Sequence, residues 1–194
     1  MLKIAISGRA GSGKNTIASM IVKDILSLNA DEYRIAAFAE PIKQIIEIMF
    51  PGCDLDSLYG PSDQRQNKIA SSINDYIDDV EVTYRQASMD IGKLGRAYGS
   101  KFWVAHMANK YNSSPKNLKA FITSDLRFPW EFQWLKDNGF IICRVKRDNL
   151  LKIDDISETG QDALKDEIFD FIIDNNQNFD HLKKQVVDIF SKIR

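Results

Sequence analysis

Hydrophobic residues along the chain follow two spacings, one typical of buried strands and the other of amphipathic helices. Short apolar runs predict strands at residues 2–7, 33–38, 120–124, 140–145 and 169–173. Apolar residues three or four positions apart predict helices at residues 15–28, from Pro41 onward, and at 84–98, 101–111, 130–138 and 179–193. Strands separated by helices of this length indicate an α/β fold with a mainly parallel central sheet and helices on both faces.

The length of 194 residues fits one compact domain, and the sequence shows no internal repeat and no low-complexity tract. We therefore expect a single domain over residues 1–194. Pro51, Gly52, Gly60 and Pro61 predict a loop-like stretch, and the residues up to about 81 are polar and acidic. This region is interpreted as an insertion in the domain.

The charge balance argues against large polyanionic partners. Lys and Arg number 26 and Asp and Glu 27, so the net field offers no attraction for nucleic acid or an acidic membrane surface. We find no signal-peptide pattern and no apolar run approaching ~18 residues, which predicts a soluble cytoplasmic protein. Cys53 and Cys143 have no metal-type spacing and are expected to be free thiols.

The strongest motif lies between the first predicted strand and the first predicted helix. Residues 8–14, Gly-Arg-Ala-Gly-Ser-Gly-Lys, fit the G-x-x-x-x-G-K phosphate loop. Gly8, Gly11 and Gly13 let the backbone N–H groups, with that of Ser12 among them, converge on one anion at a helix N-terminus. Lys14 can then bridge the terminal phosphates of a nucleotide. The alternatives are a glycine-rich turn with a surface lysine, or a loop that binds nucleotide without chemistry.

The motif departs from its usual ending. Asn15 occupies the position where a serine or threonine normally meets magnesium, and Thr16 follows one place later. Whether Asn15 or Thr16 serves the metal is left open.

A second polar group follows the apolar strand at 120–124. Asp125 is suited to hold hydrated magnesium, and Arg127 to contact a phosphate with its planar fork. Ligands of open parallel sheets bind at such strand ends. Taken alone, the pair could equally be a local ion pair.

With both motifs in view, the chain resembles the phage-type deoxynucleoside monophosphate kinases of the adenylate-kinase-like group. The resemblance implies a P-loop nucleoside monophosphate kinase fold, ATP and Mg²⁺ as cofactors, an acceptor-binding insertion at about 40–112 and a short lid at about 147–160. It also implies the host cytoplasm as the location if the protein is phage-encoded. The segments that carry it are 8–16, 38–43, Arg85-Gln86, Gly92, Gly95, Arg96, Trp103, 124–128, Glu131 and 156–158.

Phosphoryl transfer requires positive groups from several segments, because charge spreads over the transferred group. Arg85 and Arg96 lie eleven residues apart, three helical turns, so both could reach an acceptor phosphate from one side of a helix; surface arginines are the alternative. Arg147 at the start of the lid is assigned to the donor phosphates. The remaining expected acceptor-side residues are Lys43, implied by the resemblance, and Trp103 and Trp130, which could stack on a base or simply belong to the core.

The predicted reaction is ATP-dependent phosphorylation of a deoxynucleoside monophosphate, with small-molecule nucleotides as partners. A phosphomevalonate-kinase-like or dephospho-coenzyme A-kinase-like enzyme is one alternative, and a non-catalytic nucleotide-binding switch is another. A homodimer remains open.

Overall fold

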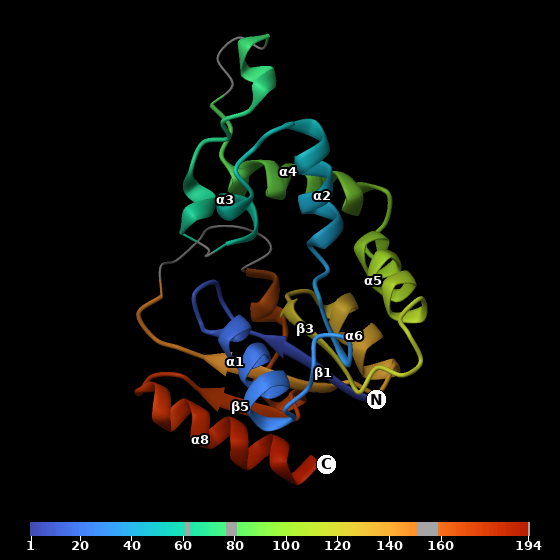
Figure 1. Ribbon diagram of the computed structural model, residues 1–194, viewed down its shortest axis with the longest axis vertical. Helices are drawn as coiled ribbons and strands as arrows, with labels where there is room; N and C mark the ends of the chain where they lie inside the picture. The colour runs from blue at the N-terminus through green and yellow to red at the C-terminus, as the bar shows by residue number, and fades with distance from the viewer. Residues whose placement is uncertain (61–62, 77–80, 151–158, 194) are drawn as a thin grey trace. The chain divides into compact units, whose positions relative to one another are not determined.

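The computed structural model describes residues 1–60, 63–76, 81–150 and 159–193, and it divides into two compact units (Figure 1). The α/β unit comprises Met1–Phe38 and Met107–Arg194, and the helical unit comprises Ala39–His106.

The α/β unit contains one parallel sheet of order β2-β3-β1-β4-β5. The first strand of the chain, which precedes the phosphate loop, lies in the middle of the sheet. Its neighbours are the strand that precedes Asp125 and Arg127 and the strand that precedes Arg147. The strands are β1 (Leu2–Ser7), β2 (Tyr33–Ala36), β3 (Ala120–Leu126), β4 (Ile141–Lys146) and β5 (Phe171–Asp174). Because all strands run in one direction, their carboxyl ends, including Ser7, Leu126 and Arg144 in register, meet at one edge.

Alternate residues of the central strands enter two different layers. Ile4, Ile122 and Val145 pack with α1 (Lys14–Met20) and α8 (Phe179–Phe190) in a fully apolar core. On the opposite face, Phe121 contacts Tyr111 and Phe140 in an aromatic cluster that also holds Trp134 of α6 (Pro129–Asp137). Helices therefore cover both faces, as Figure 1 shows for α1, α8 and α6, and the predicted P-loop kinase fold is confirmed.

The helical unit has its own core, which includes Ile46, Leu58, Tyr84 and Trp103. Its helices are α2 (Glu40–Met49), α3 (Leu55–Tyr59), α4 (Tyr84–Ala97) and the first turn of α5 (Phe102–Asn112). Short 3₁₀ helices lie at Gln64–Gln66 and Ser72–Asp75.

Two sequence-based expectations for local structure were wrong. The stretch predicted to be loop-like contains α3, because the Asp54 carboxylate accepts hydrogen bonds from the N–H groups of Asp56 and Ser57 and caps a helix there. The helix predicted at 15–28 changes to a π-helix at Ile21–Ile25 and stops, since Ser27 adopts a positive φ of 50°. In the described ranges, no helix has both the length and the apolar character needed to cross a membrane.

Candidate active site

The phosphate loop connects β1 to α1 and owes its shape to glycine. Gly8, Gly11 and Gly13 have φ values of 152°, 77° and 98°, which L side chains rarely adopt. A Cβ on Gly8 would lie 2.8 Å from the backbone oxygen of Val145, so the loop also packs closely against the end of β4. The Asn175 side chain, from the residue after β5, donates to the Ser12 carbonyl at 2.8 Å and closes the other side.

Two cations contact this loop. Lys14 Nζ donates to the carbonyl oxygens of Gly8 and Arg9 at 2.6 and 2.7 Å, and Arg147 donates to the Gly11 carbonyl at 3.2 Å. The structure thus brings Arg147 to the loop that holds Lys14, although 133 positions separate them in sequence. Positive charge from two segments meets where phosphate oxygens were predicted.

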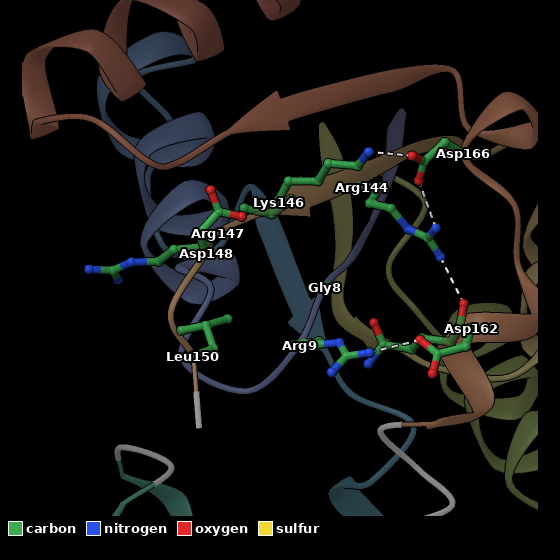
Figure 2. A pocket seen from close by; sticks show the side chains of 11 residues that line it. Gly8, Arg9, Arg144, Lys146, Arg147, Asp148, Leu150, Asp162 and Asp166 are labelled. Carbon is green, nitrogen blue, oxygen red and sulfur yellow. Dashed lines mark hydrogen bonds and ion pairs between the residues drawn. The ribbon is translucent and has the colours of Figure 1, made fainter. Parts of the chain in front are cut away.

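A cavity lies beside the loop, lined by Gly8, Arg9 and the residues that leave β4 (Figure 2). Arg144 is held firmly in its wall: it donates to Asp166 and to the Leu164 and Gln161 carbonyls, and it lies 4.2 Å over the Phe169 ring. This side chain therefore braces the wall and does not simply face solvent.

The turn after β3 is organised by two carboxylates. Asp125 Oδ1 accepts from the Phe38 N–H and the Thr123 hydroxyl, both at 3.0 Å. Glu131 Oε2 accepts from the Arg127 and Phe128 N–H groups at 2.8 and 3.0 Å, which fixes the backbone that carries Arg127.

Glu131 is an unusual acid because it is buried. Burial, with the nearby Asp125 charge as the second cause, raises the pKa of the Glu131 carboxyl to about 8. The two backbone N–H groups and Arg127 act in the opposite direction. At neutral pH this carboxyl therefore carries a proton in a large part of the population.

The start of α1 is tied to the end of β3 by one hydrogen bond. The Ser124 hydroxyl donates to Asn15 Oδ1 at 2.8 Å. Thr16, the other magnesium candidate, is exposed in the first turn of α1. The phosphate loop and the turn holding Asp125 therefore belong to one local structure.

The expected acceptor-side residues are mainly in the helical unit. Arg85 and Arg96 share α4 and are both half-buried, and Lys43 Nζ lies 4.7 Å over the Tyr59 ring. Trp103 is buried and its indole N–H donates to the Gly92 carbonyl, a placement that favours the core alternative. Trp130, in the α/β unit, stacks on Phe128 with ring centroids 4.8 Å apart and retains partial exposure.

Residues 151–158, which form most of the predicted lid and include the 156–158 motif, lie outside the described ranges. Asn175 and Gln161 were not singled out from the sequence, since an isolated amide in a polar stretch gives no signal; only the fold brings them to the phosphate loop.

Comparison with known families now adds an independent finding. Residues 95–186 match the model of the deoxynucleotide monophosphate kinase family. Over these residues the chain is similar to the deoxynucleotide monophosphate kinase family. The match spans β3, β4, β5 and most of α8, and it confirms the family resemblance and the assignment as a phosphotransferase. A search of curated proteins found no match.

Proposed function

We propose that the protein transfers the terminal phosphoryl group of ATP to a deoxynucleoside monophosphate, yielding the diphosphate and ADP. The phosphate loop carries this proposal: its glycines have the required positive φ values, and Lys14 and Arg147 both contact it. A ligand with several phosphate oxygens would replace the loop carbonyls as the partners of Lys14. The deoxynucleotide monophosphate kinase match independently supports the acceptor class.

On the donor side, Lys14 and Arg147 would stabilise charge that accumulates on the transferred group and on the leaving diphosphate. Gly8, Gly11, Ser12 and Gly13 supply backbone N–H groups for the same phosphates. The buried Ser12 hydroxyl has no hydrogen-bond partner among the described residues, which fits a loop built around an oxygen-rich ligand.

Magnesium fits the chemistry of two residues. The exposed Thr16 hydroxyl and the Asp125 carboxylate are oxygen ligands of the kind this ion takes, directly or through water. When bound, the ion would neutralise charge on the donor phosphate oxygens. The role of this chain is then to position Asp125, through the N–H of Phe38 and the hydroxyl of Thr123.

On the acceptor side we assign Arg85, Arg96 and Arg127 to the monophosphate. The attacking atom is an oxygen of that phosphate, which is already ionised near pH 7, so the reaction needs no general base. What the protein must supply is orientation and positive charge.

A coupled assay for ADP release, run across all deoxy- and ribonucleoside monophosphates and phosphomevalonate, tests the proposal. Turnover should be fastest with one or more deoxynucleoside monophosphates. Phosphomevalonate as the best acceptor, or nucleotide binding with no acceptor turned over, would replace the proposal by one of the alternatives above.

The division between donor and acceptor arginines predicts opposite effects in titration calorimetry. Arg127→Met, Arg85→Met and Arg96→Met should each weaken monophosphate binding roughly ten- to hundredfold, because one charged contact is lost, and leave the affinity for a non-hydrolysable ATP analogue unchanged. Arg147→Met should do the reverse. An arginine whose variant binds and turns over normally has no part in the site.

A further inference from the structure

Gln161 carries a buried polar atom that has no hydrogen-bond partner in the described part of the chain. It belongs to the short 3₁₀ helix Gly160–Ala163, its exposed fraction is 4%, and it lines the cavity beside the phosphate loop. Among the described residues, its Nε2 has no hydrogen-bond acceptor. A buried donor left unsatisfied costs free energy of folding, so its retention requires an explanation.

The backbone around Gln161 is anchored, whereas its amide group is held only weakly. The Gln161 carbonyl accepts from Arg144 at 3.0 Å, and a Cβ on Gly160 would lie 2.9 Å from the Phe128 ring. On the side chain, Oε1 is 3.4 Å from Ser7 Oγ, but that single hydroxyl proton has a nearer acceptor, the Leu126 carbonyl at 3.1 Å. The backbone therefore places the Gln161 side chain at the carboxyl ends of β1, β3 and β4, while its N–H groups have no acceptor among the described residues.

The surroundings indicate what the missing acceptor is. Gly8 of the phosphate loop and Arg147 line the same cavity. The buried Ser12 hydroxyl also has no partner among the described residues, and its oxygen would lie 2.6 Å from a Cβ on Gly8. Two polar groups that lack a partner among the described residues thus lie near Gly8: the Ser12 hydroxyl, close to its Cα, and the Gln161 amide, in the wall of the same cavity as Gly8. A ligand that accepts hydrogen bonds from both the Ser12 hydroxyl and the Gln161 amide would carry several oxygen atoms close together.

Charge in the cavity wall explains why a neutral donor suits this position. Arg9 pairs with Asp162 at 3.0 Å, and Arg144 and Lys146 both pair with Asp166 (Figure 2). These cations already have carboxylate partners. An amide N–H adds a directed hydrogen bond without requiring a further carboxylate to balance it.

We infer that Gln161 binds a phosphate oxygen of the donor nucleotide through its Nε2–H, making it a donor-site residue supplied from beyond the lid segment. The inference rests on the proposed function insofar as the ligand is a nucleotide. Gln161 touches the substrate, and its effect is expected in the affinity for every ligand that carries the phosphate chain.

Calorimetric titration with ADP and with inorganic tripolyphosphate, combined with thermal unfolding of the unliganded protein, tests the inference. Gln161→Met removes the unsatisfied donor at similar volume, so its melting temperature should equal or exceed that of the wild type. Its affinity for both probes should fall roughly ten- to hundredfold, the value expected for one lost hydrogen bond to a charged group. Gln161→Glu keeps an oxygen toward Ser7 but places a carboxylate beside the phosphates, and should bind more weakly still.

Gln185 provides a matched control because both ends of its amide are satisfied, by the N–H and the carbonyl of Asp174. Gln185→Met should lower the melting temperature and leave probe affinity unchanged. If Gln161→Met likewise lowers the melting temperature and leaves probe affinity unchanged, Gln161 is a structural residue and the inference is wrong. The inference is also wrong if Gln161→Met changes neither quantity. Lys14→Ala in the same titrations separates the two proposals. If Lys14→Ala loses affinity for the probes and Gln161→Met does not, only the role of Gln161 is contradicted. If Lys14→Ala binds the probes normally, the donor site itself is contradicted.

Discussion

The turns that follow β1 and β3 begin at neighbouring strand ends, yet they are shaped by different physical means. The phosphate loop after β1 depends on glycine φ values and on close backbone packing, with Gly8 against the Val145 carbonyl. The turn after β3 depends on side-chain carboxylates, since Glu131 and Asp125 accept hydrogen bonds from the backbone around Arg127 and Phe38.

The difference follows from what each turn must do. A loop that surrounds a polyanion needs its N–H groups turned inward and excludes carboxylates from its centre, so only steric freedom can shape it. The β3 turn has to present one acidic and one basic side chain in fixed directions, which buried hydrogen bonds achieve. Substitutions in the first turn should therefore change steric contacts and charge. Substitutions in the second turn should change how the free energy of unfolding depends on pH.

Lys14→Ala gives the largest expected effect, because it removes the charge around which the first turn is organised. Turnover should fall by about two orders of magnitude or more, as for other electrostatic contacts that strengthen in the transition state. Folding should be retained, since the hydrogen bonds from Lys14 Nζ to the Gly8 and Arg9 carbonyls lie within the phosphate loop and not in the apolar core. Steady-state kinetics and thermal unfolding measure the two effects. Lys183→Ala, an exposed lysine of α8, is the control; an active or unfolded Lys14 variant would contradict the role of the loop.

Glu131 should make stability depend on pH. The pKa of its carboxyl is about 8 when folded, against an ordinary value of 4.5. A raised folded pKa gives stability that is fully present below about pH 4.5 and is lost as pH rises through about 8, at up to roughly 1.4 kcal/mol per unit. Urea unfolding at several pH values in the presence of a chelator should show this loss in the wild type.

Glu131→Gln should flatten that dependence, because the amide oxygen can still accept from Arg127 and Phe128 but does not titrate. Glu131→Met removes the carboxylate that accepts from both N–H groups and should destabilise the protein at all pH values, by about 1 to 3 kcal/mol for each hydrogen bond lost. A pH profile that is identical in the wild type and Glu131→Gln would show that Glu131 is not the titrating group.

The sequence made the first turn predictable and the second only partly so. Residues 8–14 are contiguous and lie between a strand and a helix, so both the motif and its conformation could be inferred locally. Asp125 and Arg127 were predicted as site residues from their position at a strand end, and their roles stay predictions. The role of Glu131 depends on burial, and that of Arg144 on Asp166 and the Leu164 carbonyl, about twenty residues away.

The other elements were predictable to the extent that their pattern is local in the sequence. Strands were predicted well because a buried parallel strand is a continuous apolar run, as in β1 and β3. The helix at Leu55–Tyr59 was missed since five residues show too little periodicity and its Asp54 cap lies among turn-forming residues. Gln161 and Asn175 reach the phosphate loop only through the sheet order, which places β4 beside β1 and β5 beside β4.

Gly8→Ala tests whether packing, and not φ alone, shapes the first turn. Gly99 is a matched control: its φ is 151° against 152° for Gly8, but no atom lies within 4 Å of its Cβ position. Both alanine variants should carry the conformational cost, and Gly8→Ala should lose about 1 to 3 kcal/mol more, because the Val145 backbone oxygen cannot move aside. Equal free energies of unfolding for the two variants would mean that the contact with β4 is unimportant.

Asn15→Ala should have the smallest effect, and it measures how strongly the two turns are coupled. It removes the 2.8 Å hydrogen bond that Ser124 donates, and this bond is only partly buried because Asn15 is exposed, so the loss in the free energy of unfolding should be about 1 kcal/mol. A double-mutant cycle with Ser124→Ala should return a coupling of similar size, since the two side chains form one bond. Magnesium-dependent turnover should change far less in Asn15→Ala than in Thr16→Val, because we assign the metal-facing hydroxyl to Thr16. If the two variants lose turnover equally and slightly, neither side chain holds the ion, and phosphate oxygens and water do so. A larger loss in Asn15→Ala would instead assign the metal to Asn15, the residue that joins the two turns.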